Sequence, residues 1–119
     1  MSTATSNKLP VAGPPSVRRE ARLLARALLR DPEVLVLIEP TSAVDAHTEA
    51  RIAVRLAEAR RGRTTVLVTA SPLVLDHVDE VAFVLDGVVV ARGRHEDLLD
   101  DAAYRSVVGR RMDEEVMAR

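Results

Sequence analysis

Residues 33–45 read Glu-Val-Leu-Val-Leu-Ile-Glu-Pro-Thr-Ser-Ala-Val-Asp, and this stretch decides the fold. The run from Val34 to Ile38 is unbroken, apolar and rich in β-branched residues. Such a run predicts a strand that is covered on both faces, as in a parallel sheet, and Pro40 ends it. Glu39 therefore stands at the carboxyl end of a buried strand, the edge at which open α/β sheets bind ligands.

A carboxylate at this edge has two interpretations. Glu39 can act as a base toward water or hold a metal ion through water, and this makes it the candidate catalytic residue. Alternatively, Glu39 is a strand-end carboxylate that only meets solvent. On position alone, both interpretations stand.

Helices and strands alternate around this stretch, which predicts an α/β fold with a C-terminal β-hairpin. Apolar residues three and four apart indicate helices, and β-branched apolar runs indicate strands. The predicted helices cover residues 16–30, 46–61, 72–77, 95–99 and 102–110, and the predicted strands cover residues 34–38, 64–69, 81–85 and 88–91.

Capping and turn residues mark several boundaries. Asp45 can cap the helix over residues 46–61, Gly62 suits its end, and Asp86-Gly87 predicts a hairpin turn with positive φ angles. Helical periodicity divides the helix over residues 46–61 into two faces. The side chains expected to face the sheet are Ile52, Leu56 and Ala59, and those expected to face water are Glu49, Arg51, Arg55 and Glu58.

Composition indicates a folded soluble protein and excludes several function classes. The chain has 119 residues, of which 47% are hydrophobic and 29% are charged. Its net charge of −1 argues against a nucleic-acid partner. Because there is no cysteine, disulfide scaffolds and cysteine-based zinc sites are excluded.

The domain organisation predicted from composition has three parts. Residues 1–15 are small, polar and proline-rich, which predicts a disordered tail. Residues 16–110 contain all the predicted helices and strands. Residues 111–119 are expected to form a charged, frayed C-terminal tail.

Four segments, in order, resemble the ATP-binding domain of ABC transporters. In that family a helix ending in ARAL leads, after a short turn, to an apolar strand that ends in Asp-Glu-Pro-Thr-Ser-Ala-Leu-Asp. The similar segments here are residues 25–45 (ARALLRDPEVLVLIEPTSAVD), 62–69 (GRTTVLVT), 81–99 (VAFVLDGVVVARGRHEDLL) and 104–108 (YRSVV). The last segment is similar to the closing helix of the exporter subgroup. The fold implied is a partial P-loop-NTPase-like parallel sheet with flanking helices.

The resemblance implies roles for particular residues. Glu39 aligns with the residue that polarises the attacking water in ATP hydrolysis, and residues 42–45 align with a loop that contacts the opposite subunit. Ser42 and Asp45 are the candidate contact residues in that loop. The alternatives are a turn hydroxyl for Ser42 and a helix cap for Asp45.

The resemblance also implies cofactors, partners and a location. The cofactors are ATP and Mg²⁺. The partners are a transmembrane transporter subunit or a second ATPase domain, and an open sheet edge would also allow a homo-oligomer. The location is cytoplasmic, peripheral on the cytoplasmic face of the membrane.

The departures from the family pattern all affect phosphate chemistry. Ile38 stands where the family has the aspartate that helps hold Mg²⁺, and Ala70 stands where it has a histidine that contacts the γ-phosphate. The Leu-Ser-Gly-Gly-Gln signature would fall at residues 14–18, which read Pro-Pro-Ser-Val-Arg. No G-x-x-x-x-G-K-[ST] loop occurs, and Lys8 is the single lysine. We therefore expect a truncated domain with negligible ATP hydrolysis alone.

In the family, the strand that leads into the phosphate loop lies between the strands that match residues 64–69 and 81–85. Without it we expect a gap in the middle of the sheet. Three outcomes are open: the two strands close up, another chain fills the gap, or the fold is marginal.

The remaining polar residues show no catalytic pattern. His47, His77 and His95 share no metal-ligand spacing and are each expected at the surface, so we expect no metal site. Ser71, beside Pro72, is interpreted as a helix cap rather than a nucleophile. Besides the inactive ATPase relative, two hypotheses remain: a non-catalytic module that pairs with a transporter or ATPase subunit, and a decayed remnant.

Overall fold

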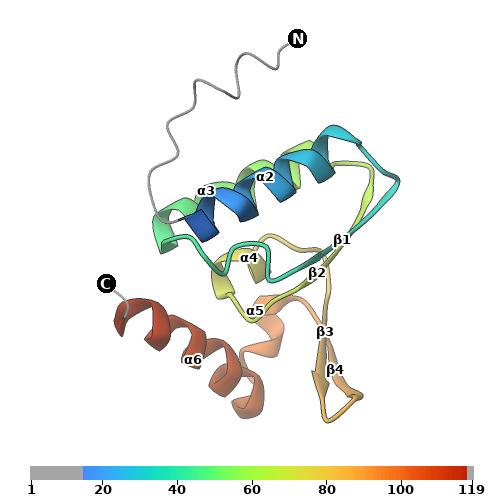
Figure 1. Ribbon diagram of the computed structural model, residues 1–119. Helices are drawn as coiled ribbons and strands as arrows, with labels where there is room; N and C mark the ends of the chain where they lie inside the picture. The colour runs from blue at the N-terminus through green and yellow to red at the C-terminus, as the bar shows by residue number, and fades with distance from the viewer. Residues whose placement is uncertain (1–14, 118–119) are drawn as a thin grey trace.

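The structure is a computed structural model and describes residues 15–117. The predicted tail therefore lies outside the described residues, apart from Pro15, which begins the first helix. The elements are α2 (Pro15–Leu29), β1 (Val34–Ile38), α3 (Ala46–Ala59), β2 (Thr64–Val68), α4 (Pro72–Leu75), β3 (Val81–Leu85), β4 (Val88–Gly93), α5 (His95–Leu98) and α6 (Ala102–Met117) (Figure 1). The predicted α/β class, with a parallel pair, flanking helices and a hairpin, is confirmed.

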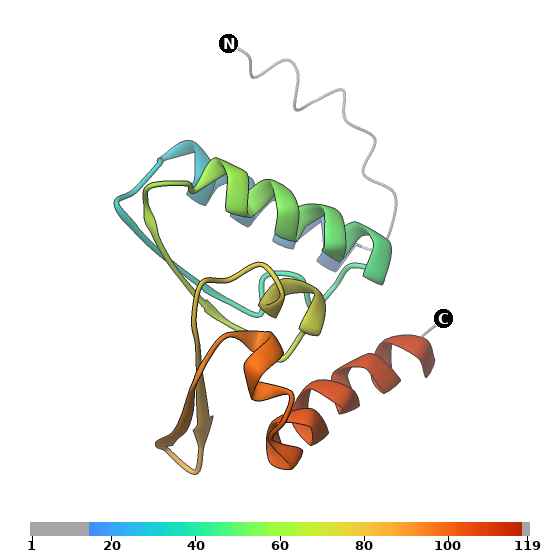
Figure 2. The same cartoon turned by 180° about the vertical axis from the view of Figure 1, so that it is seen from behind.

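The strands form two separate sheets rather than one. β1 pairs with β2 in parallel, from Val34 opposite Thr64 to Ile38 opposite Val68. β3 pairs with β4 antiparallel, and no pairing joins β2 to β3. Figure 2 shows the β3–β4 hairpin extending away from the β1–β2 pair. Of the three outcomes for the expected gap, closing up of the two strands is therefore excluded within this chain.

The parallel pair is covered on one face only, so the expectation of a strand covered on both faces was wrong. Leu35 is buried, and Leu37 and Leu67 are half-buried on the same face. On the opposite face Ile38 is 72% exposed. The other apolar side chains of that bare face are Val34, Val36, Val66 and Val68, all exposed. In Figure 1, α2 and α3 lie on the same side of the pair, which explains why the other face has no cover.

Helix α3 begins where its cap predicts. The Asp45 carboxylate accepts a hydrogen bond from the backbone amide of Thr48 (2.7 Å), and Gly62 takes a positive φ of 83° just after the helix. Leu56 is buried as expected. Two assignments on this helix were wrong: Ala59 is exposed, and Glu49 is fully buried because its carboxylate bonds a side chain of the preceding loop.

The C-terminal hairpin and helices share one core. Asp86 (φ 50°) and Gly87 (φ 78°) both adopt the left-handed conformation that the two-residue turn predicts. The ring of Phe83 on β3 packs edge-on against the ring of Tyr104 on α6, with centroids 5.3 Å apart. The buried members of this cluster are Leu75, Val81, Phe83, Leu98, Tyr104 and Val108.

His95 belongs to this core and is not at the surface, so that expectation was wrong. It is buried, and its Nδ1 forms a 2.7 Å hydrogen bond with the hydroxyl of Tyr104. This bond gives both buried polar atoms a partner, which is the condition for burying them. His47 and His77 are exposed as expected.

The closing helix is longer than predicted. It was expected to end at residue 110 and to be followed by a charged tail, but α6 continues to Met117. Residues 118–119 lie outside the described part of the chain.

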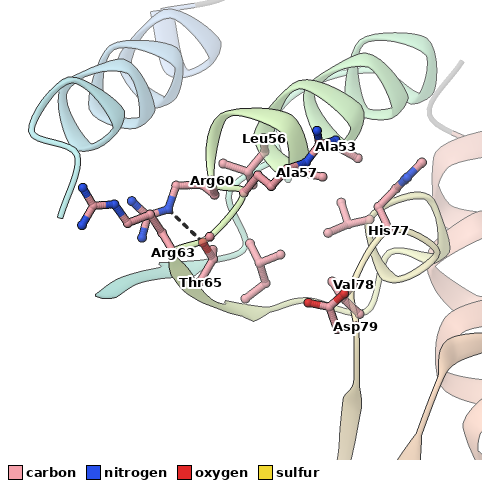
Figure 3. Close-up of a pocket in the computed structure, with 13 residues that line it drawn as sticks. Ala53, Leu56, Ala57, Arg60, Arg63, Thr65, His77, Val78 and Asp79 are labelled. Atoms are coloured by element: carbon pink, nitrogen blue, oxygen red, sulfur yellow. Dashed lines mark hydrogen bonds between the residues drawn. The ribbon is translucent and has the colours of Figure 1, made fainter. Parts of the chain in front are cut away.

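Arg60 ties the end of α3 to the starts of both parallel strands. It is 5% exposed, and its guanidinium donates to the carbonyl oxygens of Pro32 (2.6 Å) and Thr64 (2.9 Å) and to the hydroxyl of Thr65 (2.9 Å). Figure 3 shows the bond to Thr65 as a dashed line. The planar guanidinium of an arginine can donate hydrogen bonds to several fixed oxygens at once.

Replacing this fork should destabilise the fold. Arg60→Lys keeps the charge but cannot reach three separated acceptors, so we expect the free energy of unfolding to fall by about 2 kcal/mol. The matched control is Arg61→Lys at an exposed position, which should change stability by less than about 0.5 kcal/mol. Urea denaturation followed by circular dichroism measures both, and equal stability of the two variants would contradict the assigned role.

The His95–Tyr104 pair should give stability an alkaline limit. Burial raises the pKa of Tyr104 above its ordinary value of 10.0. Because the unfolded chain then loses the phenol proton first, the free energy of unfolding should fall as the pH rises above about 10.

Tyr104→Phe tests this limit in thermal melts. It should cost about 1 kcal/mol at pH 7, through loss of the bond to His95, and should flatten the decline above pH 10. An unchanged decline in the variant would show that another group is responsible.

Candidate functional site

Glu39 lies at the carboxyl edge of the parallel pair, as the sequence predicts. Its backbone amide donates to the carbonyl oxygen of Val68 (2.8 Å), so the last rung of the sheet fixes its place. Its φ of 48° is in the left-handed region, which a non-glycine residue enters at a cost of roughly 1–3 kcal/mol. The side chain is exposed. The backbone thus holds the carboxylate in solvent at the point where the strand turns.

The loop that follows Glu39 is built from short-range hydrogen bonds. The amide of Ser42 donates to the carbonyl oxygen of Glu39 (3.3 Å), and the amide of Val44 donates to that of Thr41 (3.3 Å). Ser42 is exposed, and Asp45 closes the loop as the cap of α3. The loop therefore presents Ser42 outward while Asp45 serves the helix.

A buried pair that the sequence did not reveal anchors this loop. The hydroxyl of Thr41 donates to a carboxylate oxygen of Glu49, and both side chains are almost fully buried. Helical periodicity predicted that Glu49 faces water. The signal for this pair in the sequence was the separation of Glu49 from Thr41, which spans the loop and the first turn of α3.

The space beside Glu39 is apolar. A cavity of about 240 Å³ lies between α2 and the end of β1. Among the described residues, its lining consists of Leu23, Leu24, Leu37, Ile38, Glu39 and Pro40. Glu39 is the one charged residue in that lining, and it is negative. None of these described side chains offers a hydrogen-bond donor to an anionic group.

The end of β2 adds little polar chemistry to the site. The amide of Ser71 donates to the hydroxyl of Thr69 (3.0 Å), which closes a tight turn around Ala70. Ala70 supplies only a methyl group. Ser71 occupies the cap position of α4, but its buried hydroxyl makes no capping bond, so the predicted cap is confirmed in position only.

A second cavity lies at the opposite, amino end of the pair. It has a volume of about 360 Å³ and is bordered by Arg60, Arg63, Thr65, His77 and Asp79 (Figure 3). Two of the three arginines in its described lining are engaged: Arg60 bonds backbone carbonyls, and Arg63 pairs with Asp31 (3.1 Å). This cavity is therefore a structural joint in which the side chains of Arg60 and Arg63 already have acceptors.

Among residues 15–117, no three histidine, acidic or cysteine side chains come close enough to hold a metal ion. None of the described helices combines the length and the apolar character that crossing a bilayer requires. Of the predicted site residues, Glu39 lies exposed at the end of β1, and Ser42 lies exposed in the loop that follows it.

Comparison with known proteins agrees with the resemblance in the sequence. No protein-family model matches the chain. Over 83 residues, which are 70% of the chain, it is 41% identical to the ATP-dependent lipid A-core flippases of Escherichia coli strain K12, Escherichia coli O157:H7 and Shigella flexneri. The match covers 14% of each flippase, so the chain spans a small part of their length. With its strand, loop and hairpin in the expected order, the chain is a relative of the C-terminal, ATP-binding region of ABC exporters.

Proposed function

We propose that the chain is a non-hydrolysing relative of the ABC ATP-binding region. In this proposal it contributes the Glu39 strand end and the loop over residues 42–45 to an ATP-dependent assembly, and a partner supplies the phosphate-binding groups. The observation that carries the proposal is the chemistry beside Glu39: an apolar cavity whose one charged group is a carboxylate.

A nucleotide triphosphate needs positive charge or clustered backbone amides around its phosphates. The described side chains that line the cavity beside Glu39 supply no positive charge, and the carboxylate would repel the anion. ATP and Mg²⁺ are implied by the relation to ATP-dependent exporters, but the residues present do not fit them. Ile38, next to Glu39, has no oxygen with which to hold a hard cation.

Glu39 nevertheless keeps an exposed carboxylate on a fixed backbone. Its carboxylate is exposed and its backbone is fixed by the bond to Val68, so it could orient water for a phosphate held by another chain. Ser42 is presented outward on a loop that the buried Thr41–Glu49 pair anchors. A transporter subunit or a second ATPase domain is the corresponding partner, and association with it would place the chain at the cytoplasmic face of a membrane.

Hydrolysis assays test the proposal directly. The purified chain with Mg-ATP should release phosphate no faster than buffer, and Glu39→Gln should make no difference. Mg-ATP should also leave the melting temperature unchanged, because a ligand that binds the native state raises it by mass action.

Glu33→Gln is the matched control, since Glu33 is also exposed but precedes β1 at the opposite end of the strand. Mg-dependent hydrolysis that is abolished by Glu39→Gln and kept by Glu33→Gln would overturn the proposal. A rise in melting temperature with Mg-ATP would overturn the argument that the site cannot hold phosphate.

A further inference from the structure

Helix α2 and the residue that follows it carry a row of exposed arginines. Their spacings of three, four and four residues repeat the helical turn, so the side chains share one face. The last of them directly follows α2, and its amide still donates to the carbonyl oxygen of Arg26 (3.3 Å), which continues the final turn. We call this row the arginine stripe, and its members are Arg19, Arg22, Arg26 and Arg30.

The arginine stripe faces outward because the other side of α2 packs against the fold. On that other side Leu24, Ala27 and Leu28 are half-buried. Leu24 lines the same cavity as Leu37 of β1, which shows that this side of the helix is turned toward the parallel pair. Figure 1 shows α2 at the surface of the molecule, beside α3. The stripe is therefore open to a partner.

The positive charge of the stripe is not neutralised within the described part of the chain. Among the residues whose side chains the structure describes, the ion pairs are made by other arginines, namely Arg60, Arg63, Arg92 and Arg94. The charge is also local. Residues 16–30 contain five arginines and one acidic residue, whereas the whole chain has a net charge of −1, so the remainder of the chain is net negative.

Two exposed leucines flank the arginine stripe. Leu23 is 56% exposed and Leu29 is 85% exposed. Helical geometry places them on opposite sides of the row of arginines. Each leaves apolar surface in water, which is unfavourable in the absence of a partner. The outer face of α2 thus combines a row of positive charges with apolar side chains at both borders.

We propose that this face of α2 binds the surface of a lipid bilayer that contains anionic lipids. Guanidinium groups form strong, paired hydrogen bonds with phosphate oxygens, and each cation near an anionic bilayer strengthens the attachment. The two flanking leucines enter the headgroup layer, as apolar residues of interfacial helices do. The contact needs no protein partner, so the inference goes beyond the proposed function and does not rest on it.

The observations favour a bilayer over the other polyanions. Single-stranded nucleic acids are bound largely by stacking on aromatic side chains, and the chain's Phe83 and Tyr104 are both buried. A duplex offers phosphates but no apolar layer for Leu29. The stripe is about 17 Å long at the rise of an α-helix, so a flat anionic surface can meet all four arginines at once.

Vesicle co-sedimentation tests the contact with defined lipids. The purified chain should bind vesicles of about one part phosphatidylglycerol to two parts phosphatidylcholine at least about tenfold more tightly than vesicles of phosphatidylcholine alone. Raising NaCl from about 0.05 M to about 0.5 M should remove most of this binding, because salt screens exposed charges. The neutral vesicles also control for the bare valine face of the β1–β2 pair, whose adsorption would not depend on lipid charge.

Charge-matched variants locate the contact on α2. Arg22→Gln should weaken binding to the mixed vesicles by about fivefold, whereas Arg22→Lys keeps the charge and should stay within about twofold of the parent. Arg94→Gln is the matched control, because it removes the same charge from another exposed arginine, just before α5. In Figure 1, α5 lies below the β1–β2 pair and α2 above it, so Arg94→Gln should bind as the parent does.

A third substitution tests the apolar part of the contact. Leu29→Ala should weaken binding to the mixed vesicles by about threefold, because it shortens an exposed side chain that enters the headgroup layer. Circular dichroism checks that each variant is folded, and glutamine has nearly the helix propensity of arginine. If Arg22→Gln is unfolded, Arg26→Gln replaces it.

Several results would overturn the inference. They are absence of binding, equal binding to the two kinds of vesicle, equal losses in Arg22→Gln and Arg94→Gln, and full binding by Leu29→Ala. Tighter binding of polyglutamate or duplex DNA, at the same concentration of negative charge, would instead assign the stripe to an acidic protein or a nucleic acid and would also overturn it. No nucleotide is present, so failure here leaves the hydrolysis result standing.

Discussion

The parallel pairing of β1 with β2 is the constraint on which the rest of the structure depends. Parallel neighbours require a crossover, and α3 is that crossover. Arg60, at the end of α3, reaches back to carbonyl oxygens at the starts of both strands and fixes the crossover in register. A sheet of two short strands cannot cover itself, so the helices bury one face and the valines of the other remain exposed.

The same pairing explains the position of the candidate site. The last rung, from Glu39 to Val68, places a carboxylate at the edge where α/β sheets bind ligands. Around it the chain provides leucine, isoleucine and proline, with an alanine at the end of the neighbouring strand. Position comes from the backbone ladder, and the described lining beside Glu39 is apolar apart from that one carboxylate.

Each side of the gap between the two sheets is anchored within its own part of the molecule. β2 is held by β1 and by Arg60, and β3 is held by β4 and by the core around Tyr104. The two halves are thus individually packed, and the cost of the arrangement falls on the two unpaired inner edges.

Local signals in the sequence determined the elements: the runs over residues 34–38 and 81–85, the Asp45 cap and the Asp86-Gly87 turn all depend on neighbours within a few residues. The position of Glu39 at a strand end followed from the same signals. Tertiary structure alone decided that Glu49 and His95 are buried, that one face of the pair is bare and that β2 and β3 stay apart. Each of these depends on contacts between residues distant in sequence, and a periodic pattern records which face is apolar but not whether anything covers it.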